Sequence, residues 1–123
     1  PVVTPLGVAA DGLLYNMNAD TAAAALARAV RARKLAFVSD VPGLLRDVAD
    51  PASLISTLTV GQAAALRRDG VVGGGMLPKL ESCVDAIRAG VGKVHLIDGR
   101  MPHSLLLEIF TKKGVGTEIV DDE

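Results

Sequence analysis

The chain has 123 residues, of which 50% are hydrophobic and only 2% aromatic, and its net charge is −1 at pH 7. This length fits one domain with an aliphatic core, and the balanced charge argues against a nucleic-acid or anionic-membrane partner. The one cysteine, Cys83, leaves no internal disulfide and favours a cytoplasmic location, and no apolar run reaches the roughly 18 residues of a membrane helix.

In the first half of the chain, turn signals separate short apolar runs from one alanine-rich stretch with helical spacing. The uninterrupted apolar run at residues 35–38 is typical of a strand buried in a parallel sheet. Residues 44–58 are irregular, apart from a short extended piece at 54–55. The elements predicted here are strands at 2–8, 13–15 and 35–38, and a helix from Asn18 or Asp20 to about Arg31.

The second half of the chain continues this alternation. Thr59 and Gln62 fit a capping box at the start of a short helix, and Pro78 suits the first turn of the next one. We expect the acidic C-terminal end, Asp121–Glu123, to be frayed. The remaining predicted elements are the Pro78 helix up to Gly90, a strand at 94–97, a helix at 102–110 and a strand at 117–120.

Strands that alternate with helices predict an α/β fold with a mainly parallel sheet. Ligands of such sheets bind beyond the carboxyl ends of the strands. Five polar residues follow predicted strands, so we expect several of them to share one rim of the sheet. These residues are Asn16, Asp20, Ser39, Asp40 and Asp98.

Two predicted helix starts have the composition of anion-binding sites. Residues 15–20 carry carboxamides and a carboxylate, and residues 73–79 place a lysine behind three glycines. Free backbone N–H groups and the positive end of the helix dipole favour anions at such starts. The pair therefore predicts a site for a phosphorylated or carboxylated ligand.

Five short motifs follow one another along the chain, namely Asn16–Asp20, Ser39–Leu44, Gly75–Lys79, Asp98–His103 and Gly114–Thr117. In this order they resemble the acetylglutamate kinases, a branch of the amino-acid kinase family, over nearly the whole chain. The resemblance implies that residues 1–123 form the C-terminal, nucleotide-binding half of a three-layer α/β/α sandwich. The N-terminal, acetylglutamate-binding half of that fold has no counterpart in the sequence.

The resemblance implies transfer of the γ-phosphoryl group of ATP, which brings Mg²⁺, to the γ-carboxylate of N-acetyl-L-glutamate in arginine biosynthesis. That carboxylate is already ionised at neutral pH, so the reaction needs no general base. By resemblance, Asp20 and Lys79 are catalytic, and Asn16 and Asn18 bind the acetylated amino acid. The residues implied around the nucleotide are Ser39, Asp40, Val41, Leu44, Gly75 and Met76.

A second site follows from the same resemblance. His95, Glu108 and Gly114 fall where some family members bind L-arginine as an inhibitor, and a carboxylate such as Glu108 suits a guanidinium. The partners implied are ATP, N-acetyl-L-glutamate, L-arginine, the missing N-terminal half and further copies of the chain. Neither a nucleic acid nor a membrane is expected.

Because the family's N-terminal half supplies a second lysine and glycine loop, we expect these 123 residues alone to be catalytically inert. An unpaired sheet edge predicts that they self-associate. Two alternatives stay open. One is a non-catalytic module that binds a nucleotide or arginine, and the other is an amino-acid kinase with a different acceptor.

The residues singled out also have structural interpretations. Asn16 and Asn18 suit helix capping, and Asp20 suits a helix dipole. Lys79 fits an exposed surface, and His95 fits a satisfied histidine in a buried strand. The two histidines and one cysteine lack metal-ligand spacing, so we predict no structural metal.

Overall fold

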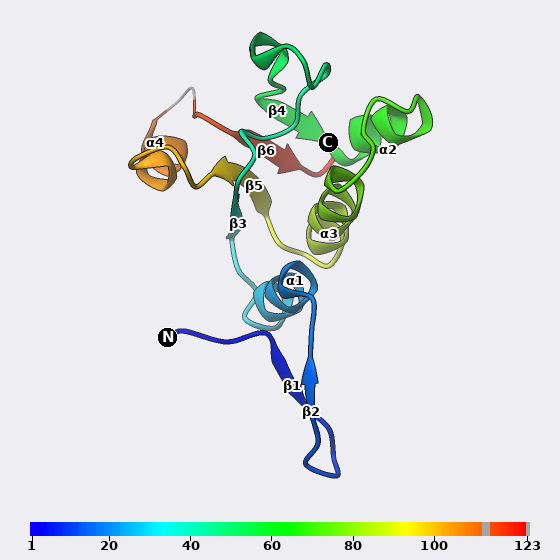
Figure 1. The fold of residues 1–123 in the computed structure, drawn as a ribbon, viewed down its shortest axis with the longest axis vertical. Coiled ribbons are helices and arrows are strands. Elements are labelled where there is room, and N and C mark those ends of the chain that lie inside the picture. The colour runs from blue at the N-terminus through cyan, green and yellow to red at the C-terminus, as the bar shows by residue number, and fades with distance from the viewer. Residues whose placement is uncertain (112–113, 123) are drawn as a thin grey trace.

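The computed structural model of the chain describes residues 1–111 and 114–122. Its main body is built on a four-stranded sheet with the strand order β3-β5-β6-β4 (Figure 1). β3 pairs with β5 and β4 with β6 in parallel, whereas the central strands β5 and β6 run antiparallel. The predicted α/β class with a mostly parallel sheet is confirmed. The strand bounds are Lys34–Ser39 for β3, Thr57–Thr59 for β4, Lys93–Asp98 for β5 and Thr117–Val120 for β6.

Helices cover both faces of this sheet. Three of them pack with one face around a mainly aliphatic core, in which Val94 and Leu96 of β5 are fully buried. His95 lies between these two residues and points to the other face, where it meets Glu108 of α4. The helix bounds are Ala19–Ala29 for α1, Val60–Arg68 for α2, Met76–Arg88 for α3 and Ser104–Phe110 for α4.

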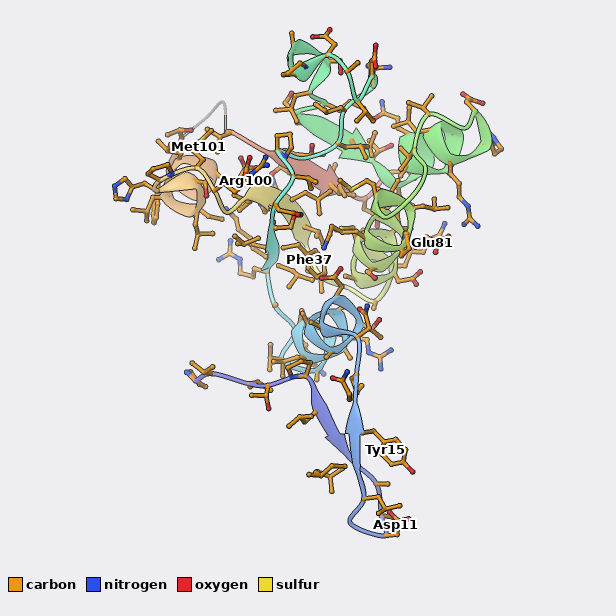
Figure 2. The ribbon with its side chains drawn as sticks, viewed as in Figure 1. Asp11, Tyr15, Phe37, Glu81, Arg100 and Met101 are labelled. Carbon is orange, nitrogen blue, oxygen red and sulfur yellow. The ribbon has the colours of Figure 1, made fainter. Side chains whose placement is uncertain are left out.

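The first two strands do not join the main sheet. β1 (Leu6–Val8) and β2 (Leu14–Asn16) form an antiparallel hairpin that projects from the body of the molecule (Figure 1). Figure 2 shows Tyr15 on this hairpin and Asp11 at its tip. Gly12 lies in the turn between the two strands and has a φ of 84°, which favours glycine.

The hairpin separates one of the polar residues that follow predicted strands from the edge of the main sheet. Ser39 and Asp98 end neighbouring strands and are register partners, as expected for one sheet edge. Asn16, in contrast, ends a strand of the separate hairpin. Asn16 is therefore not among the residues that share this edge, because pairing across a local turn places its strand outside the main sheet.

The start of α2 is held from two sides. Thr59 Oγ1 accepts a hydrogen bond from the N–H of Gln62 at 3.3 Å, and Gln62 Oε1 accepts one from the N–H of Thr59 at 3.0 Å, so the predicted capping box is confirmed. The carboxylate of Asp122 also accepts the N–H of Gly61, at 2.9 and 3.0 Å. The C-terminal end is therefore not frayed at Asp122, while Glu123 lies outside the described residues.

α4 turns its polar residues inward. Ser104 and Glu108 are buried, whereas Leu106 and Phe110 are 56% and 79% exposed. The helix buries this side because Glu108 finds hydrogen-bond donors inside the protein. The helix begins at Ser104 after His103, whose φ of 61° is left-handed. In residues 1–111 and 114–122, no helix is long and apolar enough to cross a membrane.

Replacing Thr59 with alanine removes the side-chain acceptor at the start of α2. We expect the free energy of unfolding to fall by about 1 kcal/mol, the usual cost of losing a helix N-cap. Urea denaturation of the full-length protein measures this change. Thr59→Ser keeps the hydroxyl and is the matched control, and an equal loss in both variants would contradict the role of the cap.

Candidate functional site

An ion pair joins the starts of α1 and α3. Lys79 Nζ lies 2.7 Å from Asp20 Oδ2, and the two side chains are 18% and 31% exposed. Asp20 lies in the first turn of α1, and Lys79 lies three residues after the first residue of α3. The two helix starts singled out in the sequence therefore meet, with their charged groups half-buried but open to solvent.

The floor beneath the Lys79 ammonium is apolar. Phe37 of β3 is buried, and its ring centroid lies 5.5 Å from Nζ, within the range of a cation–π contact. One turn further along α3, Cys83 is fully buried. Burial raises the pKa of the Cys83 thiol to about 12, so this cysteine stays protonated and unreactive. The lysine is thus held between a carboxylate and a ring.

The start of α3 is open. Gly75 precedes the helix without a side-chain cap, and Gly74 adopts a φ of 57° that favours glycine. Apart from the adjoining residues, no atom of the described part of the chain lies within 4 Å of the position that a side-chain carbon would take on Gly73, Gly74 or Gly75. The glycine segment before this helix is therefore uncovered.

A hollow of about 480 Å³ lies between the loop after β3 and the segment that leads into α3. Four of the six residues predicted to surround a nucleotide line it, whereas Ser39 and Gly75 do not. The four are Asp40, Val41, Leu44 and Met76. Met76 and Lys79 stand three residues apart on α3 and share one face of the helix, so the ion pair lies one turn beyond this hollow.

The sequence assigned no role to four residues that line the hollow, namely Val48, Pro51, Val71 and Val72, whereas Gly73 and Arg100, which also line it, belong to segments singled out in the sequence. Arg100 (Figure 2) donates from Nε and Nη2 to the two carboxylate oxygens of Asp98, at 2.9 and 2.8 Å. These hydrogen bonds lower the pKa of Asp98. The signal for Arg100 in the sequence was its place in the Asp98–His103 motif, just after the predicted strand at 94–97.

The remaining predicted residues lie around the ion pair and the rim. The N–H of Thr21 donates to Asn18 Oδ1 at 3.0 Å, so Asn18 caps α1. Asn16 is exposed at the end of β2. The Ser39 hydroxyl is buried and has no hydrogen-bond partner among the described residues. Both asparagines therefore lie in the short segment that leads from β2 to Asp20 at the start of α1.

The three residues predicted for arginine also come together. His95 Nδ1 lies 2.9 Å from Glu108 Oε1, and both side chains are 4% exposed. Glu108 Oε2 accepts the N–H groups of Val115 and Gly116 at 2.6 and 2.8 Å. A side-chain carbon on Gly114 would lie 2.6 Å from this oxygen, so Gly114 closes directly over the carboxylate.

These contacts settle the charge of Glu108. Burial by itself raises the pKa of this carboxyl. The hydrogen bonds from His95 and from the N–H groups of Val115 and Gly116 act in the opposite direction, and together they hold the pKa below its usual value. Glu108 is therefore a buried, ionised carboxylate that accepts hydrogen bonds from three donors.

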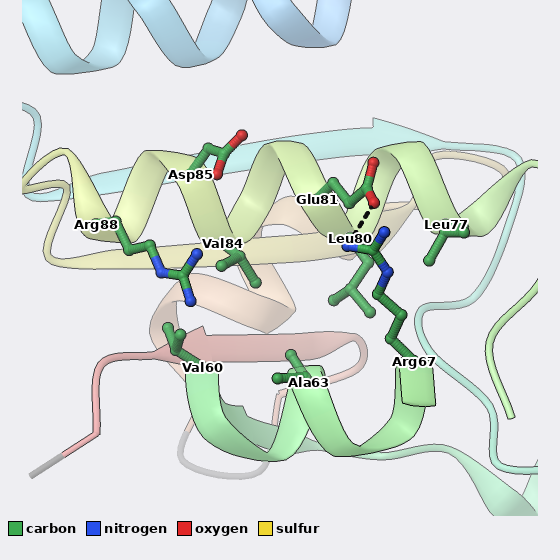
Figure 3. Close-up of a pocket in the computed structure, with 10 residues that line it drawn as sticks. Val60, Ala63, Arg67, Leu77, Leu80, Glu81, Val84, Asp85 and Arg88 are labelled. Atoms are coloured by element: carbon green, nitrogen blue, oxygen red, sulfur yellow. Dashed lines mark ion pairs between the residues drawn. The ribbon is translucent and has the colours of Figure 1, made fainter. Parts of the chain in front are cut away.

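A second hollow, of about 260 Å³, lies between α2 and α3 and contains no residue predicted for the site (Figure 3). Its floor is apolar, and Arg67 and Glu81 pair across one end at 2.8 Å. No group of three or more His, Cys, Asp or Glu side chains in the described part of the chain is arranged to hold a metal ion.

The family model described as "Amino acid kinase family" matches residues 1–98, and the chain belongs to this family. Among curated relatives it is 55% identical to the acetylglutamate kinase of Heliobacterium modesticaldum, over 98% of this chain and 41% of that protein. It is also 55% identical to the acetylglutamate kinase of Methanobrevibacter smithii, over 97% of this chain and 41% of that protein. The chain thus spans about two fifths of the length of these relatives.

Solved structures show the same fold. The chain superimposes on N-acetylglutamate synthase from Neisseria gonorrhoeae, complexed with coenzyme A and N-acetyl-glutamate, with a TM-score of 0.86 and 31% identity over 97% of this chain and 27% of that one. A complex of that synthase with coenzyme A and L-arginine superimposes with a TM-score of 0.82 and 31% identity, over 94% of this chain and 26% of that one. The fold is also shared by carbamate kinase from Giardia lamblia bound to AMP-PNP. That structure has a TM-score of 0.71 and 18% identity, over 95% of this chain and 41% of that one.

The lowered pKa of Glu108 predicts how stability depends on pH. An unfolded glutamate titrates near pH 4.3, so the stabilisation is complete above that pH and is lost as the pH falls through the lower folded value. Glu108→Gln places an amide among donors and should lower the free energy of unfolding by about 2 kcal/mol near pH 7.

Urea denaturation of the full-length protein at several pH values measures both effects. Glu81→Gln, which removes one partner of the exposed pair with Arg67, is the matched control and should cost less than about 1 kcal/mol. If Glu108→Gln had the stability of the wild type, and lost it with falling pH in the same way, the charge assigned to Glu108 would be refuted.

Proposed function

We propose that the full-length protein is an acetylglutamate kinase, which transfers the γ-phosphoryl group of ATP to N-acetyl-L-glutamate in arginine biosynthesis. The observation that carries this proposal is the 2.7 Å pair of Lys79 and Asp20, which joins the starts of α1 and α3 beside the 480 Å³ hollow. Identities of 45–55% to curated acetylglutamate kinases support this choice of acceptor.

The hollow suits the nucleoside part of ATP. Val41, Leu44 and Met76 give it apolar walls for a flat base, and Asp40 supplies a polar group at its border. The glycine-rich start of α3 lies next to Met76 and offers free N–H groups to the phosphates. We assign Mg²⁺ to the incoming nucleotide, as a counterion of its phosphates.

Lys79 is assigned to the phosphoryl group in the transition state of its transfer. Negative charge spreads over the phosphoryl oxygens during transfer, and a fixed ammonium stabilises it. Asp20 and the ring of Phe37 hold that ammonium in place before the substrate arrives. Since the acceptor carboxylate is already ionised, the remaining task is to align two anions, and no base is required.

The asparagines before α1 border the acceptor side in this proposal. Asn16 is free to contact the acetylated amino acid, whereas Asn18 offers only its amide N–H groups, because its oxygen caps α1. The chain spans 41% of its relatives. We therefore assign the rest of the acetylglutamate pocket and a second lysine to the remainder of the protein, without which these 123 residues are inert.

Replacing Lys79 with methionine tests this role. We expect kcat to fall by at least about 100-fold, because one preorganised charge is lost from the transition state, with a smaller change in KM for ATP. A coupled ATPase or hydroxamate assay of the full-length protein measures the rate. Lys34→Met removes an exposed lysine at the start of the same sheet strand as Phe37 and should leave the rate unchanged.

Two outcomes of that assay would overturn the proposal. Wild-type turnover by Lys79→Met would remove its central residue. Phosphorylation of another carboxylate or of carbamate, with none of N-acetyl-L-glutamate, would favour an amino-acid kinase with a different acceptor.

A second function, arginine binding, has separate support. The buried pair of His95 and Glu108 lies under Gly114, and the synthase that this chain resembles at 31% identity was solved with L-arginine. We propose that L-arginine binds at this cluster as an inhibitor, with its guanidinium drawn to the Glu108 carboxylate. This function would remain if the chain were a non-catalytic module.

Calorimetry of the full-length protein tests the arginine site. L-Arginine should bind, whereas L-citrulline, which lacks the charged guanidinium, should give no heat. Glu108→Gln should weaken arginine binding by at least about tenfold, and Glu81→Gln should leave it unchanged. No arginine heat, together with full activity at millimolar arginine, would reject this site.

A further inference from the structure

One buried hydroxyl ties the wall of the hollow to the sheet. Thr117, the first residue of β6, is fully buried. Its Oγ1 accepts the N–H of Leu44 at 2.8 Å and donates to the carbonyl oxygen of Ile55 at 2.7 Å. Both partners belong to the long connection from β3 to β4, and they are 73 and 62 residues away in sequence.

The two partners form the neck of a lobe. The N–H of Ile55 donates to the carbonyl of Leu44 at 2.9 Å, and Leu45 and Leu54 form a single antiparallel bridge just beyond. Within the lobe the only regular element described is a short 3-10 helix at Pro51–Ser53. The hydroxyl of Thr117 therefore bonds to both sides of the neck at once.

Gly43 makes this joint tight. It has a φ of 135°, and a side-chain carbon there would lie 2.7 Å from Thr117 Oγ1. Only glycine lets the loop lie directly on the threonine. Gly43 and Leu44 themselves line the hollow, so any movement at Thr117 moves its wall.

We propose that Thr117 is a positioning residue for the nucleotide, which sets the place of the Gly43–Leu44 wall through its hydroxyl and does not touch the ligand. This inference rests on the proposed function, in which the hollow receives ATP. It assigns Thr117 to nucleotide affinity and leaves phosphoryl transfer to Lys79, which lies on a different element.

Substitution of Thr117 by valine or serine distinguishes the effect of its hydroxyl from the effect of its shape. Thr117→Val keeps the volume but leaves a buried N–H and a buried carbonyl without their partner, whereas Thr117→Ser keeps both hydrogen bonds. We expect Thr117→Val to raise KM for ATP about tenfold. We expect kcat and KM for the acceptor to stay within about twofold, and Thr117→Ser to restore KM for ATP.

Steady-state kinetics and nucleotide titration of the full-length protein measure these effects. Thr59→Ala, which weakens the start of α2 and lines neither the hollow nor the ion pair, is the control for general destabilisation. Its KM for ATP should equal that of the wild type. An unchanged KM in Thr117→Val, or the same rise in Thr59→Ala, would overturn the inference while leaving the proposed function intact.

A wild-type protein that binds no nucleotide would instead overturn the proposed function, and this inference with it. Hydrogen exchange gives a readout that needs no variant. Because the N–H of Leu44 bonds to Thr117 and stands at the wall, its exchange should slow when ATP binds. An exchange rate at Leu44 that ATP does not change would count against Thr117 as the positioning residue, even if Thr117→Val failed to fold.

Discussion

Buried polar groups need partners, and around the start of β6 two of them find theirs. The Glu108 carboxylate and the Thr117 hydroxyl are buried there, whereas His95 Nε2 has no hydrogen-bond partner among the described residues. Glu108 accepts two backbone N–H groups there, and Thr117 supplies a donor and an acceptor to the loop on the other side. Leaving any of these groups unpaired would cost about 1–3 kcal/mol, so the segment has little freedom to move.

The direction of β6 places residues 115–117 at the edge of the sheet where β3 and β5 end. Because β6 runs antiparallel to β5, its first residue, Thr117, pairs with Leu96 near the end of β5. The ends of β3 and β5 and the beginning of β6 thus share one edge of the sheet. The hollow, the predicted nucleotide residues and the arginine cluster all gather near this edge, while the Lys79–Asp20 pair joins the helices that cover the neighbouring face.

Local patterns predicted much of this arrangement. The capping box of Thr59 and the periodicity of α3 depend on residues a few positions apart, so the sequence shows them directly. The meeting of Asp20 with Lys79 follows from two helix starts of opposite charge. Residue types therefore indicated both ends of the ion pair. The four predicted residues that line the hollow were named by the resemblance to the family rather than by residue type.

Other features depend on contacts that a linear pattern does not record. β4 has only three residues, too few for an alternating pattern. The hairpin is separated from the main sheet by pairing rather than by composition. α4 faces inward with Glu108 because the donors that satisfy this carboxylate come from His95 and from residues beyond the helix. Helical spacing alone assigns the apolar side to the interior.

The closed neck at Leu44 and Ile55 has a consequence for how such proteins diverge. The lobe beyond it is joined to the sheet at one place, so insertions or deletions at its tip leave the strands undisturbed. Doubling a loop costs only about 0.6 kcal/mol in closure entropy. A change of length at the tip of this lobe would therefore alter the outer border of the hollow at little cost in the free energy of folding.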